Sequence, residues 1–507
     1  MSFPISRDPS DAERGQRAST GISGLDDVLC GGLTPNRLYL VEGAPGTGKT
    51  TLALQFLLDG AAHGETCLYV TLSETAEELR AAAATHGWSL DQLIIFELVN
   101  EAGLDPDSEQ SILHPSEVEL GETTKGIMSR VEETRPTRLV FDSLSEMRLL
   151  AQNPLRYRRQ ILALKHFFAT RGCTVLMLDD RTSEPGDLQL HSIAHGVISL
   201  EQMPRDFGSE RRRMRIAKMR GIKFRGGYHD LMLETGGMKI FPRLIAAEHH
   251  RPLPRNARTT GSRELDILLG GGVTPGTNTL LIGPSGVGKT TTAVRTMIAA
   301  LERGERATYF LFDEGIVTLT SRSTSIGMDL GAYIDNGSLM IVQIDPAELS
   351  PGEFSNRVRE AVETHGSTLI AIDSLNAYLQ AMPGENYLLL QMHELLTYLN
   401  QQGITTLLVL GQHGLVGEMQ NDIDLSYLSD AILLFRYFEA SGEVRTAVSV
   451  VKNRTCPHER TIREFKLDAG GLRVGAALRD FRGVLSGLPA YRGEVPMLEP
   501  RNDIGKS

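Results

Sequence analysis

The chain has 507 residues, of which 41% are hydrophobic and 23% are charged, a composition typical of a folded globular protein rather than a disordered or fibrous one. Its 63 acidic residues outnumber its 52 Lys and Arg residues, and the net charge of -11 argues against a protein that binds nucleic acid through many phosphate contacts. The 4 cysteines show no metal-binding or redox spacing, so we expect free thiols and a cytoplasmic protein.

The amino-terminal residues 1–18 mix charged residues with Ser and Pro and lack the apolar core of a signal peptide, so they predict a disordered lead. The longest apolar runs elsewhere, such as 431–435 and 407–410, are too short to span a bilayer. We therefore expect no membrane anchor.

A long internal repeat organises the rest of the chain. The segment 19–35 matches the segment 259–275, and this 240-residue offset, from position 20 to position 260, holds without a gap as far as Glu74 and Glu314. A later block, Asp142-Ser-Leu and Asp373-Ser-Leu, keeps an offset of 231 residues, from 142 to 373. So long a period predicts a tandem duplication of one domain rather than a solenoid.

The repeat sets the expected domain boundaries. We expect a first domain at 19–245, a linker at 246–258, a second domain at 259–480 and a carboxy-terminal tail at 481–507. The linker is polar and is interrupted by prolines.

Each repeat contains the phosphate-loop pattern G-x-x-x-x-G-K-[ST], between an apolar strand (38–42 or 279–282) and a segment with helical spacing. Backbone N–H groups of such a loop converge on phosphate oxygens in conformations that glycine allows, and the helix that follows adds the positive end of its dipole. The glycine spacing does not fit a dinucleotide-binding fingerprint. The pattern predicts ATP-binding residues Gly43, Gly46, Thr47, Gly48, Lys49, Thr50 and Thr51 in the first repeat, and Gly283, Gly286, Val287, Gly288, Lys289, Thr290 and Thr291 in the second.

Within these loops, the chemistry of each side chain suggests its role. Lys49 and Lys289 would reach the β- and γ-phosphates, and the hydroxyls of Thr50 and Thr290 would ligate Mg²⁺. The predicted cofactors are therefore ATP and Mg²⁺.

A second apolar strand ends in a carboxylate in both repeats, at Asp142 after 138–141 and at Asp373 after 368–372. An acid at the carboxyl end of a parallel strand lies beside the phosphate loop, where it can hold Mg²⁺ through water. The alternative is an Asp that only caps the following turn.

A third strand, 67–71 or 307–312, is also followed by acids. Glu74 is present in the first repeat, and both Asp313 and Glu314 are present in the second. Phosphoryl transfer and hydrolysis need a carboxylate that orients or deprotonates the attacking oxygen, so these three are the catalytic candidates, with Asp313 a further candidate for the metal. The alternative is an ordinary acidic residue at a helix amino terminus.

With these residues in place, the chain from about Ser19 to Pro489 resembles the KaiC family of double-domain ATPases and autokinases. The resemblance implies an α/β fold of two tandem RecA-like P-loop NTPase domains, each with a mostly parallel sheet flanked by helices. It also implies a homohexameric ring. In the family, a Lys-x-Arg segment near the end of each domain reaches the nucleotide of the neighbouring subunit, and the matching residues here are Lys218, Met219 and Arg220 in the first repeat and Lys452, Asn453 and Arg454 in the second.

The resemblance also points to a phosphoacceptor. The family phosphorylates a Ser-Thr pair of its own second domain, and the matching positions here are Ser426 and Tyr427. Because a tyrosine replaces the threonine, a single acceptor site at Ser426 is expected. The tail that begins at Phe481 is similar to the family's regulatory loop, which implies a possible partner protein there.

One position departs from the family pattern in the first repeat, because Ser73 stands where the family has the first of two glutamates. We expect slower ATP hydrolysis there. The leading hypothesis is a hexameric serine/threonine autokinase and ATPase that acts in signalling or timing. A RecA-like DNA recombinase or helicase, which the acidic charge disfavours, and a nucleotide-gated scaffold are the alternatives.

Overall fold

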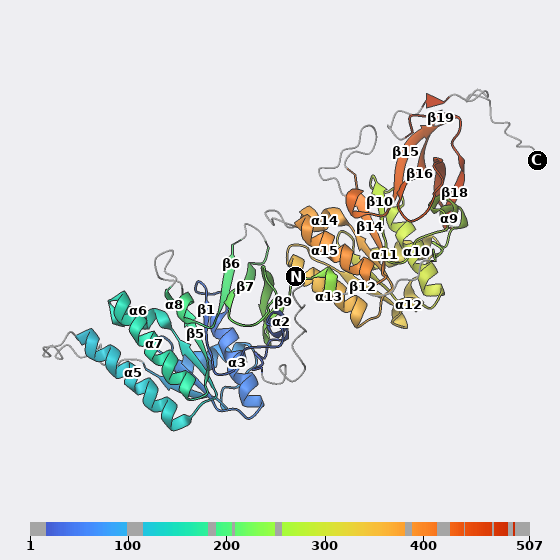
Figure 1. Ribbon diagram of the computed structural model, residues 1–507. Helices are drawn as coiled ribbons and strands as arrows, with labels where there is room; N and C mark the ends of the chain where they lie inside the picture. The colour runs from blue at the N-terminus through green and yellow to red at the C-terminus, as the bar shows by residue number, and fades with distance from the viewer. Residues whose placement is uncertain are drawn as a thin grey trace, which may run out of the picture. The chain divides into compact units, whose positions relative to one another are not determined.

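The computed structural model describes residues 17–98, 115–180, 189–204, 208–248, 256–380, 388–412, 426–440, 442–468, 471–484 and 490–491. The chain divides into two compact units, with the division between Arg243 and Leu244 (Figure 1). Each unit is an α/β domain built on one large sheet.

Among the described residues, the first unit contains a nine-stranded sheet. The strand neighbours from β3 to β6 are parallel, and those from β6 to β9 are antiparallel. In spatial order the strands are β3 (Ile94–Glu97), β2 (Cys67–Thr71), β4 (Arg138–Asp142), β5 (Thr174–Asp179), β1 (Leu38–Glu42), β6 (Gly196–Met203), β7 (Arg211–Met219), β8 (His229–Glu234) and β9 (Gly237–Phe241).

Helices cover both faces of this sheet (Figure 1). One apolar cluster joins α2 (Ser23–Val28), α3 (Lys49–Ala62) and α4 (Ala76–Thr85) to one set of strand side chains. The other cluster joins the alternate strand side chains to α5 (Pro115–Thr134), α6 (Leu144–Ala151), α7 (Pro154–Thr170) and α8 (Gln189–Ile193). Since both faces are buried, the central strands are apolar without interruption, as their sequences indicate.

The second unit repeats this strand order. Its strands are β12 (Leu339–Gln343), β11 (Ala307–Leu311), β13 (Leu369–Asp373), β14 (Thr405–Gly411), β10 (Asn278–Gly283), β15 (Ala431–Ala440), β16 (Glu443–Asn453), β17 (Arg463–Asp468) and β18 (Gly471–Ala477). The expected fold class, two tandem RecA-like domains with mostly parallel sheets, is confirmed.

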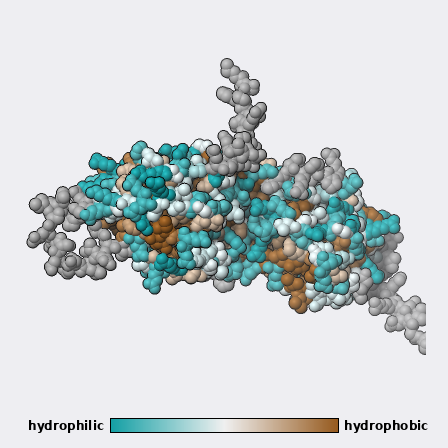
Figure 2. All heavy atoms as spheres, turned by 90° about the horizontal axis from the view of Figure 1, so that it is seen from below, coloured by the Kyte–Doolittle hydropathy of each residue, from teal (hydrophilic) through white to brown (hydrophobic). Residues whose placement is uncertain are grey.

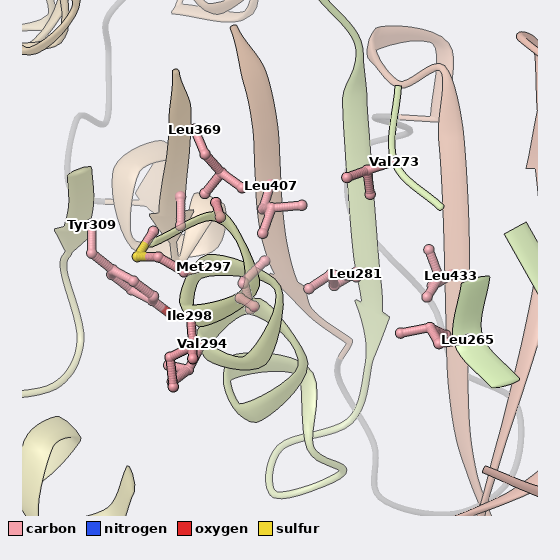
Figure 3. Packing of buried hydrophobic residues seen from close by; sticks show 14 of the residues in the cluster. Leu265, Val273, Leu281, Val294, Met297, Ile298, Tyr309, Leu369, Leu407 and Leu433 are labelled. Carbon is pink, nitrogen blue, oxygen red and sulfur yellow. The ribbon is translucent and has the colours of Figure 1, made fainter. Parts of the chain in front are cut away.

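Two apolar clusters again hold helices against the second sheet. One includes α9 (Arg263–Leu269), α10 (Lys289–Glu302) and α11 (Ile316–Ser325); the other includes α13 (Pro351–Glu363), α14 (Leu375–Gln380) and α15 (Leu388–Gln401). In Figure 3, Val294, Met297 and Ile298 of α10 lie beside Tyr309 of β11. The short α12 (Gly331–Asp335) precedes β12.

The segment that follows the division packs on the second unit. Leu244 and Ala246 are buried in the cluster that contains α15, and the 3₁₀ helix η2 (Ala246–Glu248) follows. The second core therefore includes Leu244, from the end of the expected first domain, and Ala246, the first residue of the expected linker. In the tail, β19 (Phe481–Arg482) pairs with β20 (Ala490–Tyr491), and Val484 is buried against the end of β15.

The face of the molecule in Figure 2 is mainly hydrophilic, with small apolar patches. Across the described ranges, no helix combines the length and apolar character that a membrane span requires.

Candidate functional site

The two phosphate loops lie at the carboxyl ends of the central strands β1 and β10, and the helices α3 and α10 begin at the loop lysines. Gly46 and Gly48 have φ values of 83° and 98°, and Gly286 and Gly288 have φ values of 78° and 97°. These left-handed conformations strain any residue with a Cβ. The pattern predicted from the sequence therefore forms the loop geometry that exposes backbone N–H groups to phosphate.

The lysine of the first loop is buried and has three oxygen partners. Lys49 Nζ lies 2.8 Å from the carbonyl oxygen of Gly43, 3.1 Å from that of Ala44 and 2.7 Å from Oδ1 of Asp180. A bound triphosphate would offer the ammonium group anionic oxygens in place of these partners.

The lysine of the second loop has the same carbonyl contacts but a different charge environment. Lys289 Nζ lies 2.9 Å from the carbonyl oxygen of Gly283 and 2.6 Å from that of Pro284, and the described residues place no carboxylate within ion-pair distance of it. Burial lowers the pKa of Lys289 to about 8, although Asp373 acts in the opposite direction. An anion at this loop would therefore stabilise the charged form.

The predicted metal ligands of the second loop are adjacent. Thr290 Oγ1 donates a 2.7 Å hydrogen bond to Oδ2 of Asp373, and the Tyr309 hydroxyl donates to the same oxygen at 2.8 Å. In the first unit, the Tyr69 hydroxyl donates a 2.6 Å hydrogen bond to Asp142. Burial raises the pKa of both aspartates above the ordinary value.

These donor sets fit Mg²⁺, which prefers oxygen ligands and is bound by one or two carboxylates together with substrate phosphates. No group of three His, Cys, Asp or Glu side chains within the described residues could hold a metal ion alone. Phosphate oxygens would therefore have to complete the shell around Thr50 and Asp142, or around Thr290 and Asp373.

The three candidate catalytic acids also lie beside the loops. Burial is the larger cause of a raised pKa of Glu74, and the negative charge of Asp142 raises it further. In the second unit, Asp313 accepts a short hydrogen bond from Ser374, and Glu314 forms a 2.9 Å ion pair with Arg322. Both line a cavity of about 550 Å³ that also contains Lys289, Thr290 and Thr291.

The remaining loop residues support the loops from within. Thr47 donates a 2.8 Å hydrogen bond to the carbonyl oxygen of Ala44, and Thr51 Oγ1 lies 3.5 Å from Nε2 of His86. Val287 is buried in the apolar core of its unit.

The residues predicted to reach a neighbouring nucleotide lie at the amino ends of the parallel strands, opposite the carboxyl ends where the phosphate loops lie. Met219 pairs with Gly196, which pairs with Tyr39 near the start of β1, whereas the phosphate loop follows the end of β1. In the second unit, Asn453 pairs with Ala431, which pairs with Thr279 near the start of β10. Five residues of strand separate the two edges by roughly 15 Å, which a lysine or arginine side chain cannot span.

At this edge the cations bind local carbonyl groups. Lys218 Nζ lies 2.9 Å from the carbonyl oxygen of Ala194, and Arg220 lies 2.7 Å from that of Ser192. Lys452 lies 2.7 Å from the carbonyl oxygen of Ser429, and the half-exposed Arg454 lies 3.9 Å from Asp430. The geometry does not bring these cations to the phosphate loop of their own unit.

The predicted acceptor segment lies at the same edge as Lys452. Ser426 begins the 3₁₀ helix η3 (Ser426–Leu428), and the side chain of Ser426 lies outside the described residues. Tyr427 is 50% exposed, whereas Ser429 is fully buried.

Sequence reasoning missed two side chains near the first loop. Asp180 directly follows β5 and pairs with Lys49, and the rule that identified Asp142, an acid after an apolar strand, could have found it. Arg212 of β7 donates from Nε to the carbonyl oxygen of Gly46 at 3.3 Å. At the second phosphate loop, the Tyr437 hydroxyl donates a hydrogen bond to the carbonyl oxygen of Ser285 at 3.2 Å.

Comparison with known proteins agrees with this geometry. The KaiC ATPase family model matches residues 18–245 and again residues 258–479. The circadian clock protein KaiC3 of Synechocystis sp. is 27% identical over 94% of this chain and 95% of its own length. The circadian clock oscillator proteins KaiC of Acaryochloris marina and Synechococcus elongatus are 27% and 28% identical over 93% of this chain, and over 90% and 91% of their own lengths. With both domains matched and both phosphate loops formed, the chain belongs to the KaiC family of ATPases.

Proposed function

We propose that this protein is an ATP-hydrolysing serine autokinase that phosphorylates Ser426 of another copy within a homohexameric ring, for signalling or timing. The second unit would be the kinase. The names of the relatives, which refer to circadian clocks, support the timing part of the proposal.

One observation carries the proposal. In the second unit, the phosphate loop follows the carboxyl end of β10, whereas the segment that contains Ser426 precedes β15 at the amino end of the same sheet. Because roughly 15 Å of strand separates these edges, ATP bound to this loop cannot reach the Ser426 of its own unit. Transfer therefore needs a second copy, and the exposed neighbour Tyr427 shows that this edge is accessible.

The side chains around the second loop support phosphoryl transfer. Asp313 or Glu314 would accept the proton of the attacking serine hydroxyl as the new O–P bond forms and the bond from the γ-phosphorus to ADP breaks. Lys289 would balance the phosphate charge. Thr290 and Asp373 would hold Mg²⁺, which supplies charge neutralisation when bound.

The cations at the amino edge support a ring. Lys218, Arg220, Lys452 and Arg454 cannot serve their own loops, and contact with the nucleotide of another copy would use them. The 4 cysteines are free thiols, which supports a cytoplasmic location. The tail beyond residue 481 remains the proposed docking site for a regulatory protein.

The decisive experiment is incubation of the full chain with γ-labelled ATP and Mg²⁺, followed by mapping of the label. We expect label on Ser426, its loss in Ser426→Ala and its retention in the matched variant Tyr427→Phe. Label that persists in Ser426→Ala would overturn the assignment of the acceptor, and unlabelled protein with DNA-stimulated ATPase activity would favour a DNA motor.

Transfer between copies has its own test. A Lys289→Ala chain keeps the acceptor but loses its kinase loop, and a Ser426→Ala chain keeps the loop but loses the acceptor. Neither variant should become labelled alone. When the two are mixed, we expect label on the Lys289→Ala chain. No label in the mixture would contradict transfer between copies.

A further inference from the structure

The first unit holds a glutamate and a histidine together at the end of β1. Glu42 is the last residue of this strand, and its side chain is only 7% exposed. His191 of α8 donates from Nε2 to Oε2 of Glu42 at 2.8 Å, and the Ser199 hydroxyl donates to Oε1 at 2.6 Å. The two hydrogen bonds hold the carboxylate in one orientation and favour its ionised form.

The second unit has no such pair at the matching positions. Glu42 of β1 lies in register with Ser199 of β6, and the corresponding partners in the second sheet are Ile282 of β10 and Leu434 of β15. The same sheet therefore forms with two apolar side chains at these positions. Burial of a carboxylate costs free energy unless it is paired, so a role in chemistry explains the polar pair better than a role in folding does.

The hydrogen bond to Glu42 determines which nitrogen of His191 can react. A carboxylate only accepts, so Nε2 carries the hydrogen and Nδ1 of the neutral ring carries the lone pair. No group in the described part of the chain hydrogen-bonds Nδ1, and this atom keeps contact with solvent in a side chain that is 26% exposed. Nδ1 is therefore an accessible nucleophile.

His191 occupies the place in the first unit that Ser426 occupies in the second. Each lies five residues before the strand that pairs with the strand of the phosphate loop, from 191 to 196 for β6 and from 426 to 431 for β15. Lys218 and Lys452 hold the two segments in the same way. Each donates to the carbonyl oxygen of the residue two positions before that strand, at 2.9 and 2.7 Å. The duplication thus places a histidine where the proposed serine acceptor lies.

The sheet lies between this histidine and the helix that follows the phosphate loop of the same unit. Leu40 packs in the cluster that contains α8, and Glu42, two residues further along β1, faces the same side. The helix α3 packs on the other face, against Tyr39 and Val41. As for Ser426, a nucleotide held by another copy is therefore the donor that we consider.

We propose that His191 is a second phosphoryl acceptor, modified on Nδ1 by ATP bound to the first-unit loop of another copy. The lone pair of Nδ1 forms the N–P bond as the bond from the γ-phosphorus to the bridging oxygen breaks, and that electron pair leaves with ADP. Nδ1 carries no proton to lose. Glu42 balances the positive charge that develops on the ring and can take the Nε2 proton. The proposal rests on the ring of the proposed function but not on phosphorylation of Ser426.

The test uses the full chain with Lys289→Ala and Ser426→Ala, which disables the second loop and removes the serine acceptor. After incubation with γ-labelled ATP and Mg²⁺, we expect label that is stable in alkali and lost in mild acid, as phosphohistidine is and phosphoserine is not. Mass spectrometry at alkaline pH should place this label on His191. A further Lys49→Ala change should abolish it.

A matched pair of variants tests the acceptor nitrogen. His191→Gln keeps an amide N–H that can donate to Glu42 but lacks Nδ1, so it should lose the acid-labile label. His166→Gln makes the same change at an exposed position of α7 and should keep it. If His191→Gln does not fold, the mapping at alkaline pH decides, because it needs no change at residue 191.

Light scattering with ATP separates this proposal from the proposed function. A ring without acid-labile label, or acid-labile label that maps to another residue, overturns the assignment of His191 alone. Absence of acid-stable label on Ser426 in the unaltered chain contradicts the serine autokinase alone. A monomer in the presence of ATP overturns both, because each acceptor needs a donor on another copy.

Discussion

At the scale of single residues, the two units differ most in their acids. The strand β2 is followed by one carboxylate, Glu74, whereas β11 is followed by Asp313 and Glu314. Burial raises the pKa of Glu74, and the negative charge of Asp142 raises it further. Glu74 must be ionised to orient or deprotonate water, so hydrolysis in the first unit should fall with decreasing pH at a midpoint above the ordinary value for glutamate.

Replacement of this side chain gives the first prediction. In a chain whose second loop is disabled by Lys289→Ala, Glu74→Gln should lower ATP turnover by roughly 10²-fold, because the amide cannot accept the proton. The neighbouring exposed Glu77→Gln on α4 is the matched control and should leave turnover unchanged. Steady-state phosphate release measures both. Equal turnover with and without Glu74 would show that another group activates the water.

The second loop yields a prediction about pH. The pKa of Lys289 is lowered to about 8, so at higher pH the empty site holds a neutral lysine. ATP binding must then bring a proton with it, and the affinity should fall roughly tenfold per pH unit above 8. Titration of ATP between pH 7 and 9.5, in a chain with the first loop disabled by Lys49→Ala, measures this slope. In Lys289→Arg the side chain stays charged, so the dependence of ATP affinity on pH should flatten. An unchanged dependence would show that another group titrates.

At the scale of strands and loops, the acids occupy different strand ends in the two units. Asp142 ends β4 and Asp373 ends β13, which take the same place in the two sheets. In the second unit the extra acid, Asp313, follows the strand on one side of it, whereas in the first unit the extra acid, Asp180, follows β5 on the other side. The negative charge of Asp180 also raises the pKa of Glu74 and of Asp142.

This difference in position predicts that Asp180 supplies, in the first unit, part of the negative charge beside the phosphate loop that Asp313 supplies in the second. In the Lys289→Ala background, Asp180→Asn should lower ATP turnover by about tenfold, through lost positioning charge near Lys49. Adding Ser73→Asp should restore part of that loss. If Asp180→Asn raises turnover instead, the ion pair with Lys49 is inhibitory and the prediction is wrong.

The sequence predicted the elements that carry the loops more fully than it predicted the site. The strands expected at 67–71 and 138–142 are confirmed because buried parallel strands form uninterrupted apolar runs. The helix after the first loop extends to Ala62, and its Gly60 lies so close to Arg138 that a Cβ there would be 2.5 Å from the Cδ of that side chain. That close approach joins residues 78 positions apart and leaves no local signal.

The same limit applies to the sites. Asp142 and Lys49 belong to local patterns, so their neighbourhood could be predicted. The cluster of Glu42, His191 and Ser199 gathers side chains from three separate segments that carry no shared pattern, and only the folded sheet brings them together.

At the scale of the whole molecule, the two ends of each sheet are chemically complementary. The carboxyl ends of the strands carry the phosphate loop, and the amino ends present cations that cannot reach the loop of their own unit. In the proposed ring these two ends would meet between successive copies, because a contact between two different surfaces can repeat around a closed ring. ATP would then be a structural component of the interface as well as a substrate.

Assembly is therefore expected to depend on ATP and on the amino-edge cations. Light scattering should give about 334 kDa with ATP, six times the 55.6 kDa of one chain, and a smaller mass without it. Lys218→Ala with Arg220→Ala should shift the ring toward single chains, as should Lys49→Ala, whereas Lys125→Ala, at an exposed position of α5, should not. High salt should weaken assembly, because it screens charges across the interface. A monomer under all conditions would contradict contacts between copies. If the ring stays intact in the Lys218→Ala, Arg220→Ala double variant, other surfaces must stabilise it.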